Sequence, residues 1–114
     1  MKCVLVPVDG EPEVQEIGAA AFPYLIKVFP EGFDGIRLGQ NVIGYVGDSS
    51  LLDGSPRNTR GLDLTDACYR RAVQRDYHAD VLGPMVVLGV TGGGNERDIP
   101  AAFMLDYFPT LTEG

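Results

Sequence analysis

Several residue types are scarce in this chain, and each scarcity excludes a class of protein. The 114 residues include no tryptophan, one histidine and two cysteines, Cys3 and Cys68. Two cysteines outside any Cys-x-x-Cys pair indicate neither a disulfide scaffold nor zinc or redox chemistry. No apolar run approaches the ~20 residues that span a bilayer, and the N-terminal run is too short for a secretory signal. We expect a cytoplasmic protein without a membrane segment, in which both thiols are buried and free.

Positive charge is also scarce, and it is concentrated in one segment. Sixteen acidic residues against nine basic ones give a net charge of -7. An acidic protein repels phosphates, so direct binding to nucleic acid or to a membrane surface is disfavoured. Residues 57–75 nevertheless hold five arginines against two aspartates. This segment is either a solvated helix with ordinary salt bridges or a small anion site on an acidic body.

The remaining composition is that of a globular protein, with 45% hydrophobic and 22% charged residues. We predict one α+β domain over residues 1–108 and a loose tail over residues 109–114. The fold is expected to be a small, mostly antiparallel sheet of about four to five strands with two to three short helices.

Hydrophobic periodicity gives the order of the elements. β-branched and aliphatic runs predict strands over residues 2–8, 24–29, 35–38, 42–46 and 85–90. Helical spacing and end signals predict helices over residues 14–22, 63–77 and 99–108, with Asp63 as the N-cap of the second. Residues 85–90 are apolar on both faces, which indicates a central strand covered on both sides, or a strand covered by a helix on one face and by a partner chain on the other.

No catalytic constellation is visible. Residues 92–94 are three glycines, but they lack the spacing of a dinucleotide or phosphate loop and are typical of a turn. His78 lies between Asp76 and Asp80, where a helix end explains it better than a metal site does. We therefore expect no enzymatic activity, no metal and no cofactor.

The best binding candidates lie where the long loop of residues 47–60 meets the second helix. Guanidinium groups bind carboxylates and phosphates bidentately, and helix N-termini attract anions. The candidates for a small anionic ligand are Arg57, Asn58, Arg60, Arg71 and Arg75. Asp63 and Asp66 compete for the same arginines, so an internal salt-bridge network is the alternative.

The order of strand, Asp-Gly turn, short helix, meander and loop ending in an asparagine resembles the family of domain of unknown function 3846. The matching stretches are SPRNTRG at residues 55–61, which contains Asn58, and VLGPMVVLG at residues 81–89. Ser55 and Gly61 stand where the pattern has leucine and alanine. The resemblance covers roughly residues 1–100 and implies a cytoplasmic accessory protein of a phage, plasmid or other mobile element, without an assigned activity. Asn58 would be a turn or cap residue, or a ligand contact.

Three functions remain open. The favoured one is a protein-binding accessory factor, with an acidic nucleic-acid mimic as a special case that requires the acids of residues 9–16 and 96–106 to share a face. The second is a binder of, or enzyme on, an anionic ligand at Arg57, Asn58 and Arg60. The third is a structural homo-oligomeric subunit that associates through residues 85–90 and the aromatic residues near the C-terminus, Phe103, Tyr107 and Phe108.

Overall fold

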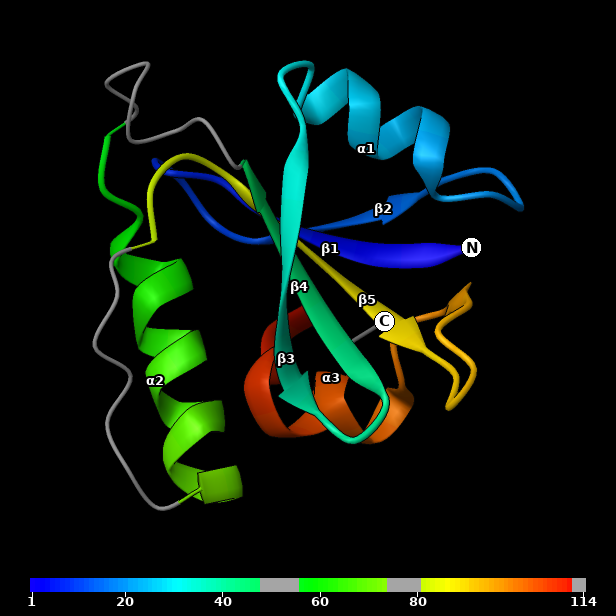
Figure 1. The fold of residues 1–114 in the computed structure, drawn as a ribbon. Helices are drawn as coiled ribbons and strands as arrows, with labels where there is room; N and C mark the ends of the chain where they lie inside the picture. The colour runs from blue at the N-terminus through cyan, green and yellow to red at the C-terminus, as the bar shows by residue number, and fades with distance from the viewer. Residues whose placement is uncertain (48–55, 74–80, 112–114) are drawn as a thin grey trace.

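The sheet is built around one apolar strand, β5, whose six residues are all buried. β5 pairs antiparallel with β1 on one side and with β4 on the other, and the complete order is β2-β1-β5-β4-β3, with β6 also paired to β5. The computed structural model describes residues 1–47, 56–73 and 81–111 (Figure 1). The strands are β1 (Lys2–Val6), β2 (Glu13–Glu16), β3 (Phe33–Gly39), β4 (Val42–Gly47), β5 (Met85–Val90) and β6 (Glu96–Arg97).

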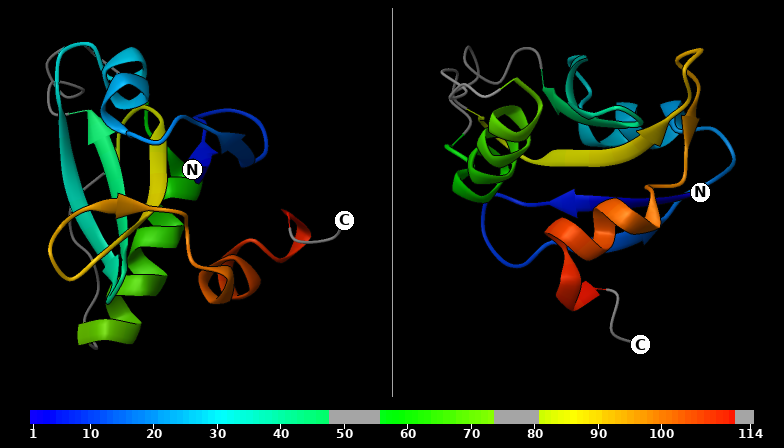
Figure 2. Two further views of the ribbon diagram at one scale, coloured as in Figure 1. Left: turned by 90° about the vertical axis from the view of Figure 1, so that its right-hand side faces the viewer. Right: turned by 90° about the horizontal axis from the view of Figure 1, so that it is seen from below.

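Helices cover both faces of this sheet. Successive residues of a strand point to opposite sides, so the apolar residues of β5 need cover on both faces. Val86 and Leu88 of β5 pack in one core cluster with Leu25 of α1. Met85 and Val87 pack in a second cluster that contains residues of α2 and α3. Figure 2 shows α1 and α3 on opposite sides of the strands. The helices are α1 (Phe22–Val28), α2 (Thr59–Val73), α3 (Ala101–Tyr107) and a single 3-10 turn, η1 (Pro109–Leu111).

Most of the predicted architecture is confirmed. The protein is an α+β fold with an antiparallel sheet, and the central strand predicted at residues 85–90 is covered on both sides by helices of the same chain. The hairpin predicted at residues 35–38 and 42–46 is β3 and β4. Of the predicted tail, residues 109–111 form η1, and residues 112–114 lie outside the described part of the chain. No helix of the described ranges is long and apolar enough to cross a membrane.

Two neighbouring predictions are wrong and exchange places. Residues 14–22 were expected to be helical but contribute β2, which pairs antiparallel with β1. Residues 24–29 were expected to form a strand, but residues 24–28 lie in α1 and Phe29 is its C-cap, while Pro23 occupies the first turn, where proline is favoured. Leu25 and Phe29, four residues apart, are both buried against the sheet. Packing of Leu25 and Phe29 against the sheet overrides the local strand preference of residues 24–29. Pairing with β1 overrides the helix preference at the start of residues 14–22.

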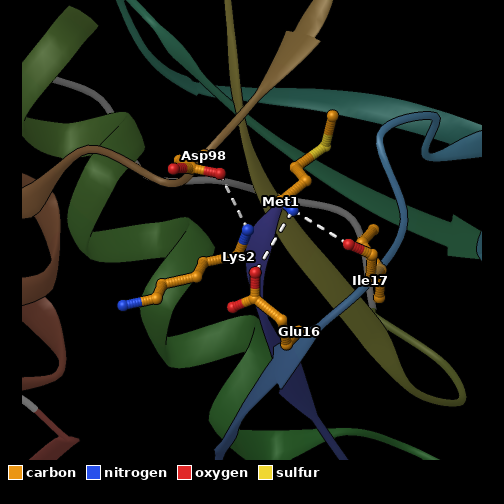
Figure 3. A network of polar contacts seen from close by, with 5 residues as sticks. All are labelled: Met1, Lys2, Glu16, Ile17 and Asp98. Carbon is orange, nitrogen blue, oxygen red and sulfur yellow. Dashed lines mark hydrogen bonds and ion pairs between the residues drawn. The ribbon is translucent and has the colours of Figure 1, made fainter.

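One glycine allows the chain to pass from β6 to α3 across the end of β5. A Cβ atom at Gly89 would overlap the backbone oxygen of Asp98. The same crossing is tied to β1, because the Lys2 N–H donates to Asp98 Oδ1 at 2.9 Å and the Ile99 N–H donates to the Lys2 carbonyl at 2.9 Å. Figure 3 shows the Asp98 contact. Gly89 therefore sets how closely the segment before α3 approaches the sheet.

Replacing Gly89 with alanine should destabilise the protein by roughly 1–3 kcal/mol, because a backbone oxygen, and not a flexible side chain, would have to move. The free energy of unfolding in urea measures this change. Gly92→Ala is the matched control, since nothing lies within 4 Å of its Cβ position. Equal stability of the two variants would contradict the assignment.

Candidate functional site

Asn58, the candidate residue suggested both by the loop and by the family resemblance, is a structural cap. Its side chain is 0% exposed. Nδ2 donates to the carbonyls of Val6 at 3.0 Å and Gly83 at 2.9 Å, and Oδ1 accepts the Gly61 N–H at 2.8 Å. Because this last bond caps α2, the helix begins at Thr59 and not near the predicted cap Asp63. Of the two roles left open for Asn58, the structure shows the cap.

The backbone around Asn58 reinforces this junction. The Asn58 N–H donates to the Val81 carbonyl at 2.7 Å, and the Gly83 N–H donates to the Pro56 carbonyl at 2.8 Å. A Cβ atom at Gly61 would lie 3.1 Å from both Asn58 Cγ and Val81 Cγ1. The loop before α2 and the segment before β5 are thus held side by side with no room for a ligand at the amide.

The candidate arginines do not converge on one position. Arg60 Nη2 lies 2.7 Å from Glu11 Oε1, and Arg71 Nη1 lies 3.3 Å from Asp106 Oδ2. Eleven residues separate the two arginines on α2, which is about 16 Å along a helix. Arg57 is exposed beside Asn58, and Arg75, like His78, lies outside the described residues. The salt-bridge alternative therefore describes Arg60 and Arg71, and anion binding stays a prediction.

Both cysteines are free and buried, as the sequence predicted. Burial raises the pKa of the Cys3 thiol from its ordinary 9.0 to about 11, and burial also raises the pKa of Cys68. The thiolate is the reactive form, so neither thiol is set up as a nucleophile near neutral pH. Within the described ranges, no group of three or more His, Cys, Asp or Glu residues could hold a metal ion.

The structure adds one surface that sequence reasoning missed, the outer edge of β2. Met1 and Ile17 exchange two backbone hydrogen bonds of 2.8 Å, so Gln15 and Glu13 also turn their backbone groups toward β1. The N–H and C=O groups of Val14 and Glu16 consequently point away from β1. In the described part of the chain, no strand pairs with this outer side of β2.

An apolar groove of about 430 Å³ begins beside this edge. Val14 lies opposite Val4, which belongs to the core beneath α2 and α3, so the side chains of Val14 and Glu16 point to that face. Val14 is 40% exposed and Leu105, on α3, is 62% exposed. The residues that line the groove include Lys2, Val14, Ile99, Met104, Leu105 and Leu111.

Acidic side chains lie along β2 and at the start of α3. Glu16 points to the face of β2 that carries the groove, Glu13 points to the opposite face, and Asp98 lies where the chain enters α3. Figure 3 shows Glu16 and Asp98 flanking Met1 and Lys2 at the start of β1: the amino group of Met1 lies 3.4 Å from Glu16 Oε1, and the Lys2 N–H contacts Asp98. Three carboxylates thus lie near two amines, the side chain of Lys2 and the amino group of Met1. We call β2, the groove and these three acids the edge surface.

The other acids of residues 96–106 are engaged elsewhere. Glu96 Oε1 accepts the Tyr45 hydroxyl at 3.1 Å, and Asp106 pairs with Arg71. Burial and Glu96 raise the pKa of Tyr45 to about 12. Tyr45 packs on the side of α1 and Arg71 lies on α2, so the acids of residues 96–106 do not all share one face with those of residues 9–16.

Comparison of the chain with protein-family models, curated proteins and solved structures finds no match. The resemblance to the family of domain of unknown function 3846 stays a prediction.

Asn58→Ala should lower the free energy of unfolding by about 3 kcal/mol, because two carbonyls and one N–H lose their partners in a buried site. Asn58→Asp should be similarly destabilised, since it keeps the capping oxygen but loses both donors. Urea unfolding measures both variants, with Lys27→Ala at an exposed position of α1 as control. Asn58→Ala with unchanged stability would show that the amide is not structural.

Stability should fall at alkaline pH. The folded state raises the pKa of Cys3 to about 11, so the unfolded state releases this proton first and the stabilisation is complete below pH 9.0. As pH rises from 9.0 to 11, the loss from this thiol should be on the order of 2 kcal/mol. Urea unfolding at several pH values should give a shallower decline for Cys3→Ala. Parallel declines for the two proteins would contradict this origin.

Proposed function

We propose that this chain is a protein-binding accessory factor and that it binds its partner through the edge surface. The observation that carries the proposal is the exposed outer side of β2, where Val14 and Glu16 present backbone groups beside an apolar groove. Exposed apolar area next to unused backbone donors and acceptors is a typical site for protein association. The family resemblance supports a role in a phage or other mobile element, in the bacterial cytoplasm.

The charge of the edge surface indicates a partner with a basic surface. Glu13, Glu16 and Asp98 outnumber the amines of Lys2 and Met1, so nucleic acid and anionic membranes would be repelled. A nucleic-acid enzyme, whose own binding surface is basic, is one such partner. The engagement of Glu96 and Asp106 within the chain favours a compact contact over a long row of phosphate-like charges.

The alternatives have less support from the geometry. An anionic ligand would have to displace Glu11 from Arg60 or Asp106 from Arg71. A homo-oligomer would need the apolar strand and late aromatics, but β5 is buried beneath helices of its own chain. Phe103 and Phe108 are 8% and 7% exposed, so they pack inside the protein.

Reversing the charge of the edge surface should abolish partner binding. The tagged chain is used to capture proteins from bacterial lysate, and quantitative mass spectrometry compares the wild type with the Glu13→Lys, Glu16→Lys double variant. Retention of the partner should fall at least about tenfold, equivalent to about 1.4 kcal/mol. Circular dichroism should show an unchanged fold, since both residues are exposed and the Glu16 pair with Met1 is a surface contact.

The matched control reverses two exposed acids near the other edge of the sheet, Glu31→Lys and Asp34→Lys, with the same change in net charge. This control should retain the partner. Equal retention by both double variants would overturn the assignment of the edge surface, and so would the absence of any protein after a moderate-salt wash. Displacement of a captured nucleic-acid enzyme by added DNA would identify the mimic case.

A further inference from the structure

We propose that the partner contributes an extended segment that pairs with the outer edge of β2 as an additional strand. This inference rests on the proposed function and goes beyond it, because it specifies the conformation of the bound segment and the pattern of its side chains. It follows from three features of the edge surface: the direction of its backbone groups, the position of the groove and the placement of its acids.

The backbone of β2 is set up for strand addition. Because Gln15 and Ile17 face β1, the N–H and C=O groups of Val14 and Glu16 face outward at the spacing of an antiparallel ladder. A segment lying alongside can therefore form hydrogen bonds with both residues. Pro12, at the next outward position, has no N–H, so the ladder is limited to a short stretch.

The groove selects an apolar side chain. A residue directly opposite Val14 in an added strand points to the same face of the sheet as Val14 does. That face carries the groove of about 430 Å³, with Leu105 exposed on its far wall. An aliphatic side chain at this position would be buried between Val14 and Leu105, which removes apolar surface of all three residues from water.

The acids favour a basic residue near the apolar one in the added strand. A residue two positions from the apolar one falls opposite Glu16 on the same face, because strand side chains alternate. Lysine or arginine there is opposite a carboxylate, and opposite charges in directly paired positions stabilise a sheet. The bound segment should therefore contain a basic residue two positions from an aliphatic one.

The same acids disfavour a second copy of this chain as the occupant. Two-fold antiparallel pairing of β2 with itself would gather Glu13 and Glu16 of both copies along one ladder and would place no lysine opposite them. Like charges across strands are destabilising, and charged edge strands resist edge-to-edge association. Charge complementarity thus favours a basic segment of another protein.

A defined peptide tests this directly. The probe is a short, end-blocked peptide that contains lysine, leucine and lysine in this order, each separated from the next by one threonine. With its leucine opposite Val14, one lysine lies opposite Glu16 in either strand direction. In NMR of the full chain, the peptide should slow amide hydrogen exchange at Val14 and Glu16 and leave Asp34 at the opposite edge unchanged. Replacing both lysines with glutamate should raise the Kd at least about tenfold.

Two variants separate strand addition from general charge attraction. Val14→Pro removes an outward N–H while leaving the bonds between β1 and β2 in place, so the Kd should rise about tenfold. Leu105→Glu places a charge on the groove wall and should have an effect of similar size. Phe22→Glu is the matched control, because Phe22 on α1 is also 62% exposed, and its Kd should stay within about twofold.

The outcomes distinguish the two proposals. Wild-type affinity in both Val14→Pro and Leu105→Glu, or peptide-induced protection at β3 in place of β2, overturns strand addition. If the lysate partner is lost with Glu13→Lys, Glu16→Lys but bound normally by Val14→Pro and Leu105→Glu, the protein-binding function stands and strand addition fails. A dimer by light scattering that Val14→Pro converts to a monomer overturns the assignment of another protein as the occupant.

Discussion

The side-chain amide of Asn58 is the interaction on which the arrangement of this protein depends. It joins the end of β1, the first turn of α2 and the segment that leads into β5, three parts of the chain far apart in sequence. Burial requires that its donors and its acceptor all find partners, and one relative placement of Val6, Gly61 and Gly83 provides them. The amide thus fixes β1 beside β5 and sets α2 against one face of the sheet.

β1 in turn positions the elements of the edge surface. Along one side it pairs with β2, and at its first residue Lys2 holds Asp98 and Ile99 through backbone groups. β2 and α3 both line the groove, so both of these lining elements are attached to β1. A site mounted on paired strands and a packed helix keeps its geometry better than one mounted on loops. The position of the groove is therefore a consequence of the core.

The sequence predicts the elements whose periodicity is strong and misses those that depend on distant partners. The apolar run of residues 85–90 could only be a buried strand or a buried helix, and its length of six favours the strand. Residues 24–29 are rich in β-branched and aromatic residues, and the four-residue spacing of Leu25 and Phe29 was the opposing signal. β2 forms because β1 offers a free edge. The groove joins β2 to α3, so no local pattern contains it, whereas the role of Asn58 as a cap was among the alternatives that the loop suggested.

Two arginines of α2 neutralise acids that lie next to this helix. Arg60 compensates Glu11, and Arg71 compensates Asp106, so the acids next to α2 are paired. Glu13, Glu16 and Asp98 outnumber the amines of Lys2 and Met1, so the edge surface carries an excess of negative charge. Attraction between exposed charges weakens with ionic strength, whereas backbone pairing and burial in the groove do not depend on it in this way. The acids can therefore govern which segments approach β2, and the backbone and the groove then govern how long a segment stays.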